Sequence, residues 1–212
     1  MAGPHDDRPL VTAGTSLDAA SAAMVLVHGR GASGRGIVRS MEPIQREGLA
    51  MLAPQAAGNT WYPNSFLVPV EQNEPGRSSG LDAIDRAVTQ ATAADIEPSR
   101  IVLLGFSQGA CLASEYVARN PRRYGGLAAL SGGLIGETVD EDSFTGSLEG
   151  TPVFLGCSDV DPHIPVERVD VTASVFEALD GDVTKEIYAG MGHSVNQAEY
   201  DQVEALVDAV MD

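Results

Sequence analysis

The chain has 212 residues, 43% of them hydrophobic, which suffices for one domain with a substantial core. Thirty Asp and Glu residues face 13 Lys and Arg residues, and the net charge of −17 argues against nucleic acid and anionic membranes as partners, because phosphate contacts need clustered cations. Two cysteines exclude a disulfide framework, and no spacing typical of zinc ligands is present, so we expect no metal and no cofactor. No run of 18 apolar residues exists, so we expect no membrane insertion.

The acidic residues are scattered along the chain, and Lys185 is the only lysine. Dense exposed carboxylates keep a protein soluble in concentrated salt, where screening confines their repulsion to about 3 Å at 1 M. This pattern favours a halophilic protein over one that binds a basic protein partner, since such a partner needs a localised acidic patch. The N-terminus lacks the basic and apolar segments of a signal peptide, which indicates a cytoplasmic location.

Residues 1–9 contain Pro4, Asp6 and Pro9 and little that can be buried, so we expect a disordered tail followed by one domain over 10–212. From there apolar runs and helix-like stretches alternate. The predicted strands are 10–13, 22–27, 49–53, 101–105, 126–130, 151–155 and 183–188, and the predicted helices are 34–47, 78–95, 109–119, 166–179 and 196–211. This alternation predicts an α/β fold with a mainly parallel sheet of about seven strands and helices on both faces.

The segment Gly105–Gly109 follows the apolar strand 101–105 and leads directly into a helix-like pattern. This is the strand–turn–helix context in which G-x-S-x-G acts as a nucleophile elbow. The sharp turn forces the central Ser107 towards a positive φ, and the flanking glycines let neighbouring backbone approach. We therefore predict Ser107 as a nucleophile, with the backbone N–H of Gln108 directed at the carbonyl under attack.

A serine nucleophile needs a base and a carboxylate that orients it, in the chain order Ser, acid, His. His193 lies in a Gly-rich loop after the strand 183–188, where such a base belongs. The acid must come from the loop after the strand 151–155, where Asp159 and Asp161 compete. Spacing alone does not separate these two residues.

Each of these motifs follows the carboxyl end of a predicted strand, where ligands bind in parallel sheets. The segment His28–Arg30 also follows a strand, the one over 22–27. We therefore expect four segments to converge on one edge of the sheet: His28–Arg30, the elbow with Ser107, the loop with the acid and the loop with His193.

From about residue 22 the chain resembles the phospholipase/carboxylesterase branch of the α/β-hydrolase superfamily, which includes acyl-protein thioesterases and small bacterial carboxylesterases. Gly105–Gly109 matches the family's G-F-S-Q-G, and Gly190–His193 matches its G-x-G-H. Further similarity lies in Val25–Gly31, which resembles the L-H-G-x-G oxyanion loop, and in Ala53–Ala56 with Trp61–Pro63, which resembles P-x-A…W-[YF]. The resemblance implies an α/β-hydrolase fold in a single domain.

The family's acid lies in D-x-x-[VI]-P, which places Asp161 at the acid position and favours it over Asp159. Two departures bear on substrate preference. The segment Gly156–Asp161 is one residue longer than the family's H-G-x-x-D, and Arg30–Ser33 stands where the family has L-G-D-T.

The expected function is a serine carboxylesterase that acts through an acyl-enzyme, with Ser107, Asp161 and His193 as the triad and the backbone N–H groups of Arg30 and Gln108 as the oxyanion hole. Residues 134–150 are too short for a large lid, which favours short- to medium-chain esters. An acyl thioesterase or lysophospholipase shares all these residues and remains an alternative. A non-catalytic, ligand-binding hydrolase fold is a third interpretation.

The loop-rich stretch 57–78 carries Trp61, Tyr62 and Phe66, which either form a substrate pocket or pack the loop onto the body. Met191, beside the predicted base, either lines the same pocket or packs beneath it. The predicted partner is a small-molecule ester or thioester, and the protein is a monomer or a homodimer.

The sequence also suggests roles for several other side chains. The Arg30 guanidinium is either a solvated charge or a substrate contact. We expect His28 and His163 to be structural polar residues, and Cys111 and Cys157 to be buried apolar ones.

Overall fold

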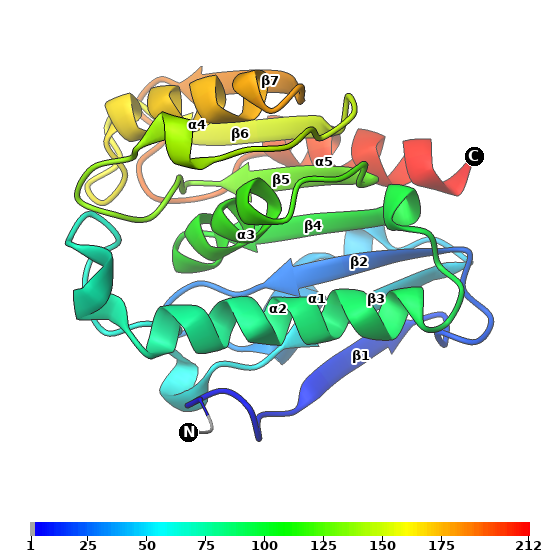
Figure 1. Ribbon diagram of the computed structural model, residues 1–212. Helices are drawn as coiled ribbons and strands as arrows, with labels where there is room; N and C mark the ends of the chain where they lie inside the picture. The colour runs from blue at the N-terminus through cyan, green and yellow to red at the C-terminus, as the bar shows by residue number, and fades with distance from the viewer. Residues whose placement is uncertain (1–2) are drawn as a thin grey trace.

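The computed structural model describes residues 3–212, which form a seven-stranded sheet in the order β1-β3-β2-β4-β5-β6-β7 (Figure 1). β1 pairs with β3 in antiparallel fashion, and all other pairs are parallel. The strands are β1 (Leu10–Gly14), β2 (Ala22–Val27), β3 (Leu49–Pro54), β4 (Ile101–Phe106), β5 (Gly126–Leu130), β6 (Pro152–Ser158) and β7 (Asp182–Tyr188). The predicted mainly parallel sheet is confirmed.

Five α-helices cover the two faces: α1 (Gly34–Ser40), α2 (Gly76–Thr92), α3 (Gln108–Arg119), α4 (Val166–Ala178) and α5 (Gln197–Met211). In Figure 1, α2, α3 and α4 lie in front of the sheet and α1 and α5 lie behind it. Two apolar clusters match these layers, one with Ile84, Leu112 and Val169 from the front helices and one with Ile37 and Val207 from the rear helices. Among residues 3–212 no helix is long and apolar enough to cross a membrane.

One predicted helix is wrong in length. The expected helix over 34–47 ends at Ser40, and a separate 3₁₀ turn follows at Glu42–Ile44. Pro43 explains the break, because proline has no N–H for the helix ladder and its ring disfavours helical backbone in the preceding residue.

The N-terminal segment also differs from expectation, since His5 is buried and anchors the otherwise largely exposed residues 3–9 to the body. His5 is 2% exposed. Its Nδ1 accepts from the Ala57 N–H at 3.0 Å, so Nε2 carries the proton and donates to the Trp61 carbonyl at 2.8 Å. The His5 N–H donates to Ser79 Oγ at 2.9 Å. A histidine with both ring nitrogens satisfied can be buried, which composition alone did not indicate. Residues 1–2 lie outside the described part.

Candidate active site

The turn between β4 and α3 has the geometry of a nucleophile elbow. Ser107 is its one-residue link, with φ 55° and ψ −121°. Its N–H donates to the Leu130 carbonyl at 2.9 Å, and its own carbonyl accepts from the Cys111 N–H at 3.0 Å. Positive φ is costly for a residue with a Cβ, so these bonds hold Ser107 in a conformation that the free chain rarely adopts.

The glycines on either side of Ser107 are sterically required. A Cβ on Gly105 would lie 2.3 Å from the Gly109 carbonyl oxygen. A Cβ on Gly109 would lie 2.0 Å from the Val27 carbonyl oxygen, because α3 begins directly against the end of β2. Both approaches are far inside van der Waals contact, which gives the G-x-S-x-G pattern a physical reason here.

A continuous chain of hydrogen bonds runs from Ser107 through His193 to Asp161. His193 Nε2 lies 2.8 Å from Ser107 Oγ, and Nδ1 lies 2.7 Å from Asp161 Oδ2. The other oxygen, Oδ1, accepts from the backbone N–H groups of His163 at 2.8 Å and Ile164 at 3.1 Å. Burial raises the pKa of Asp161, but these donors outweigh it and hold the pKa below its ordinary value. The ionised carboxylate accepts from Nδ1–H, which leaves Nε2 free to take the serine proton.

The competing carboxylate, Asp159, lies in a different place. Its Oδ1 accepts from the Gly190 N–H at 2.7 Å, and the neighbouring Ser158 Oγ accepts from the Gly192 N–H at 2.9 Å. Gly190 and Gly192 have positive φ values of 69° and 73°, so this loop needs its glycines. Asp159 and Ser158 therefore fasten the loop that carries His193.

Two aromatic rings bracket the imidazole of His193. The Phe106 ring centroid lies 5.1 Å from it in a tilted arrangement, and that of His163 lies 4.9 Å away in an edge-on arrangement. His163 was expected to be a structural polar residue, and the structure places it in the lining of the cleft beside the imidazole.

Two backbone N–H groups near Ser107 are available to a ligand. Gln108 is the first residue of α3, where N–H groups have no partner within the helix. Across the cleft, the N–H groups of Gly31 and Ala32 donate to loop carbonyls, whereas that of Arg30 donates to no acceptor within residues 3–212. Gln108 and Arg30 both line the cleft, and their role as an oxyanion hole stays a prediction.

A cleft of about 450 Å³ opens in front of Ser107 and His193. Tyr62 and Phe66 line it, as do Cys111 and Ile164. Burial raises the pKa of the Cys111 thiol to about 12, so it is an uncharged group in the cleft wall.

Trp61, in contrast, does not line the cleft. It is fully buried, and its Nε1–H donates to the His28 carbonyl at 2.8 Å. Its ring packs between His5 and His28, with centroid distances of 5.2 and 4.9 Å. His28 Nε2 accepts from the Ala56 N–H at 3.1 Å, and burial lowers the pKa of both histidines. His28 is therefore structural, as predicted, and Trp61 is a core residue.

Met191 also lies outside the cleft lining. Its Sδ lies 3.0 Å from Asn196 Nδ2, at the start of α5. Asn196 and Glu199 form a capping box there, with reciprocal bonds of 2.9 Å. Burial raises the pKa of Glu199 to about 7. This cap anchors the far end of the loop that carries His193.

The cleft wall is held by the residue that follows the nucleophile. Gln108 Oε1 accepts from the Trp61 N–H at 2.9 Å, and Nε2 donates to the Tyr62 carbonyl at 2.8 Å. The Arg30 guanidinium binds the same stretch by donating to backbone carbonyls, among them that of Tyr62 at 3.0 Å. The Arg30 side chain is thus a structural tie to this loop, a role that the sequence did not suggest.

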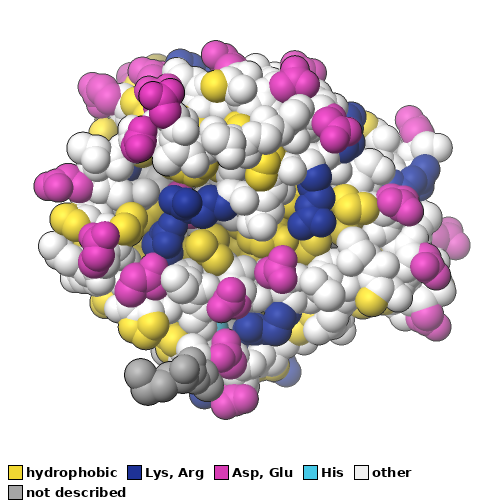
Figure 2. Space-filling view, viewed as in Figure 1, with side chains coloured by type: hydrophobic (Ala, Val, Ile, Leu, Met, Phe, Trp, Pro, Cys, Tyr) yellow, Lys and Arg dark blue, Asp and Glu magenta, His cyan; other side chains and the backbone are white. Residues whose placement is uncertain are grey.

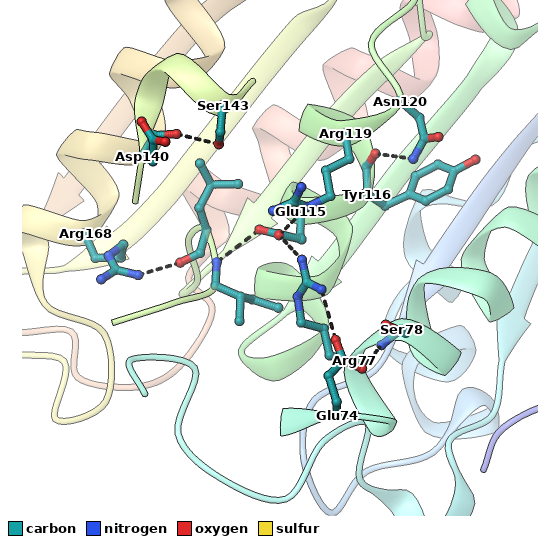
Figure 3. Close-up of polar contacts among 12 residues, drawn as sticks. Glu74, Arg77, Ser78, Glu115, Tyr116, Arg119, Asn120, Asp140, Ser143 and Arg168 are labelled. Atoms are coloured by element: carbon teal, nitrogen blue, oxygen red, sulfur yellow. Dashed lines mark hydrogen bonds and ion pairs between the residues drawn. The ribbon is translucent and has the colours of Figure 1, made fainter. Parts of the chain in front are cut away.

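A buried ion-pair network lies behind this wall (Figure 3). The side chain of Glu115 is fully buried and pairs with Arg77 from α2 and with Arg119 at 2.6 Å. Its Oε2 accepts from the Ile135 N–H at 3.2 Å, and Arg77 also pairs with Glu74 at 3.1 Å. Glu115 therefore joins α2, α3 and the loop after β5.

The loop after β5 connects the ion-pair network to the cleft through Phe66, which lines the cleft. The Gly136 N–H donates to the Phe66 carbonyl at 2.8 Å. Arg168 from α4 donates to the carbonyls of Leu134 at 2.8 Å and Gly136 at 2.7 Å, and its guanidinium lies 5.7 Å from the Phe66 ring centroid. Phe66 is held from both its backbone and its ring.

Sequence reasoning missed these supporting roles. Gln108 was noted only for its backbone, Asp159 only as a rival acid, and Glu115 only as part of a helix pattern. The partners of Gln108 lie 46 and 47 residues away along the chain, and that of Asp159 lies 31 residues away. Glu115 pairs with Arg119 at i+4, but its other partners lie 20 and 38 residues away, so no local pattern could reveal the tie to α2 and to the loop after β5.

Charged side chains of both signs cover the surface on the side of α2 and α3. Figure 2 shows Asp and Glu side chains scattered over this face, with Lys and Arg side chains both near its middle and at its margin. Cys111 and Cys157 are buried and unpaired, as predicted. Within residues 3–212 no cluster of three His, Cys, Asp or Glu side chains is placed to hold a metal ion.

Comparison with known proteins supports the resemblance seen in the motifs. The profile of the phospholipase/carboxylesterase family matches residues 13–211. The chain belongs to this family. The match includes β2, the elbow and the loop that carries His193, and it confirms both the predicted family and a relationship to carboxylic ester hydrolases.

A solved phospholipase/carboxylesterase from Dyadobacter fermentans is 35% identical, with a TM-score of 0.91, and each chain covers 100% of the other. The predicted α/β-hydrolase fold is therefore confirmed for this family member.

Among curated proteins, the family member is similar to acyl-protein thioesterase 1 of Gibberella zeae, at 34% identity over 57% of the chain. It is also similar to acyl-protein thioesterase 1 of Saccharomyces cerevisiae, at 30% identity over 69% of the chain. The chain spans 52% and 64% of the length of these two relatives.

Proposed function

We propose that the protein is a serine carboxylesterase that hydrolyses short- to medium-chain carboxylic esters through an acyl-enzyme. The observation that carries this proposal is the continuous hydrogen-bond chain from Asp161 through His193 to Ser107, at a strained elbow that opens into a cleft. Family membership supports the reaction class.

In the first step, Ser107 Oγ attacks the ester carbonyl while His193 Nε2 accepts its proton. Asp161 stabilises the imidazolium through Nδ1. The carbonyl oxygen gains negative charge and is stabilised by the backbone N–H groups of Gln108 and Arg30, each such donor typically contributing about 2.7–4 kcal/mol. His193 then returns the proton to the departing alcohol.

In the second step, His193 takes a proton from a water molecule, which attacks the acyl-enzyme carbonyl. The same oxyanion donors stabilise the second tetrahedral intermediate. Its collapse releases the carboxylic acid, and the proton on His193 returns to Ser107 Oγ.

The size of the cleft supports a small substrate. A volume of about 450 Å³ lies towards the lower end of the range of about 300–1,000 Å³ that small-molecule sites span. Phe66 and Cys111 offer an apolar wall for a short acyl chain.

An acyl thioesterase is the second candidate, because the two curated relatives at 30% and 34% identity are named acyl-protein thioesterases. The same nucleophile, base and oxyanion donors serve both reactions. Only the leaving group differs, a thiol in place of an alcohol.

The test is hydrolysis of p-nitrophenyl acetate, butyrate and octanoate by the wild type and by Ser107→Ala, with butyrylthiocholine as the thioester. Turnover that vanishes in Ser107→Ala supports the serine mechanism, and the ratio of kcat/KM for ester and thioester separates the two candidates. Labelling of Ser107 by a fluorophosphonate is the control for an activated serine. A folded wild type that neither turns over these substrates nor reacts with the probe is a binding protein instead.

We also propose that the protein works in a salt-loaded cytoplasm. The net charge of −17 and the single lysine support this setting.

A further inference from the structure

Arg30 is the one Lys or Arg residue among the described residues that line the cleft. Its side chain is exposed and lines the cleft. Nη2 donates to the carbonyl oxygens of Tyr62 at 3.0 Å and Asn64 at 2.7 Å, and Nη1 donates to that of Pro63 at 3.0 Å. These three bonds fix the guanidinium at the lip of the cleft, directly after Gly29 of the oxyanion loop.

The charge of Arg30 is not neutralised by a protein carboxylate. Within residues 3–212, the Lys and Arg side chains that pair with a carboxylate are Arg46, Arg77, Arg86, Arg119 and Lys185. Arg30 binds only carbonyl oxygens, whose dipoles fix its position and leave its net charge in place. Three of the five N–H donors of its guanidinium are used, so Nε–H and one Nη1–H are free.

The cleft lining itself contains no Asp or Glu among the described residues. Its ionisable side chains are Arg30, His163 and His193, together with the uncharged Tyr62 and Cys111. In a chain with 30 acidic and 13 basic residues, this cleft has a fixed cation at its lip, and the nearby carboxylate of Asp161 lies behind the His193 ring, outside the lining.

We propose that the substrate carries an anionic group, a carboxylate or a phosphate, which pairs with Arg30 while the ester carbonyl lies at Ser107. This inference rests on the proposed function. Arginine binds such oxygens with charge-assisted hydrogen bonds that lysine does not reproduce geometrically. In an assay at an ionic strength of about 0.15 M the Debye length is about 8 Å, so scattered carboxylates beyond that distance are screened, whereas a contact pair at the lip persists.

The experiment compares two matched pairs of chromogenic esters. In the first pair the anion is on the acyl group: p-nitrophenyl hydrogen adipate against p-nitrophenyl 6-methylheptanoate. In the second it is on the leaving group: 3-carboxy-4-nitrophenyl butyrate against 4-nitrophenyl butyrate. We expect kcat/KM for the anionic member of one pair to exceed that of its neutral partner by about tenfold, and the pair that shows this identifies the side of the substrate that meets Arg30.

Two variants separate the charge of Arg30 from its role as a loop tie. Both Arg30→Lys and Arg30→Gln loosen the stretch Tyr62–Asn64 and lower activity towards neutral esters. The preference is therefore measured within each variant, as the ratio of kcat/KM for the anionic ester to kcat/KM for its neutral partner. Arg30→Lys keeps the charge and therefore retains part of the preference for the anionic ester, whereas Arg30→Gln brings the ratio of kcat/KM for the anionic and neutral esters close to one. Arg100→Gln, directly before β4 and therefore at the end of the strands opposite the cleft, removes the same charge and leaves this ratio unchanged.

The outcomes are distinguishable. Turnover of the neutral esters with no anionic preference in either pair overturns this inference alone, as does a preference that survives in Arg30→Gln. No turnover of any of the four esters by the folded wild type overturns the proposed ester hydrolysis and this inference with it.

Discussion

The side chain of Gln108 donates to the backbone carbonyl of Tyr62 at 2.8 Å. The residue that follows the nucleophile therefore has two separate tasks. Its backbone N–H is a proposed oxyanion donor, and its buried side-chain amide holds the wall against which an acyl chain would pack.

Gln108→Ala keeps the backbone donor and removes the tie to Trp61 and Tyr62. We expect kcat/KM to fall by roughly tenfold or more, because small displacements of the wall misplace the substrate. Steady-state kinetics on p-nitrophenyl butyrate measure this. Gln90→Ala, on the exposed side of α2, is the matched control, and equal activity of both variants would contradict the assigned role.

Asp161→Asn and Asp159→Asn form a pair that separates the acid from the loop fastener. Asp161→Asn removes the carboxylate that fixes the imidazole tautomer and should lower kcat by about 10⁴. Asp159→Asn keeps an oxygen for the Gly190 N–H and should leave kcat within about tenfold of wild type. A larger loss in Asp159→Asn than in Asp161→Asn would reverse the assignment.

Glu115→Ala should destabilise the fold by about 3–5 kcal/mol, because it leaves Arg77 buried without its main partner. Urea unfolding monitored by Trp61 fluorescence gives the change in unfolding free energy. Glu177→Ala, an exposed position on α4, should stay within about 0.5 kcal/mol of wild type. A small effect of Glu115→Ala would mean that the network contributes little net free energy.

His5 and His28 predict a loss of stability in mild acid. Burial lowers both pKa values below the unfolded value of 6.5. As the pH falls below about 6.5, the unfolded chain binds protons that the folded protein does not, so the unfolding free energy decreases by up to about 1.4 kcal/mol per pH unit for each histidine. Above that pH the two states bind protons equally at these sites, and the stability they give is fully present.

His5→Asn isolates this effect, since it removes one of the two titrating rings. The difference in unfolding free energy between wild type and variant, measured from pH 5 to 8, should shrink towards the acid end. A constant difference across this range would show that His5 does not titrate on unfolding.

The salt dependence follows from the net charge of −17. We expect the urea midpoint and the esterase activity to rise together between 0.1 and about 2 M KCl, as repulsion between carboxylates is screened. Full stability and activity in dilute buffer would count against a halophilic origin.

The sequence predicted well where a local pattern has one physical solution. Gly105 and Gly109 mark the elbow because any Cβ there collides with backbone, and the strands beside them are buried on both faces. The helix after the oxyanion loop was overextended, since the amphipathic pattern continues past the break that Pro43 causes.

The sequence did not predict where a side chain lies when its contacts are with residues far away along the chain. A loop aromatic such as Trp61 has no periodic pattern to tell cleft from core, and its burial depends on His5 and His28 from two other segments. The choice between Asp159 and Asp161 likewise depends on which carboxylate meets Nδ1 of His193, a three-dimensional fact that the family motif indicated and spacing did not.

The stretch Trp61–Asn64 is tied to the side chains of Gln108 and Arg30, whose backbones supply the proposed oxyanion donors. The shape of the cleft wall and the rate of hydrolysis therefore both depend on this loop. Reshaping this stretch to admit a longer acyl chain would also disturb the donors and slow the chemistry. Cys111 and Ile164 line the same cleft without holding either donor's side chain, so they are the better positions at which to redesign chain-length preference.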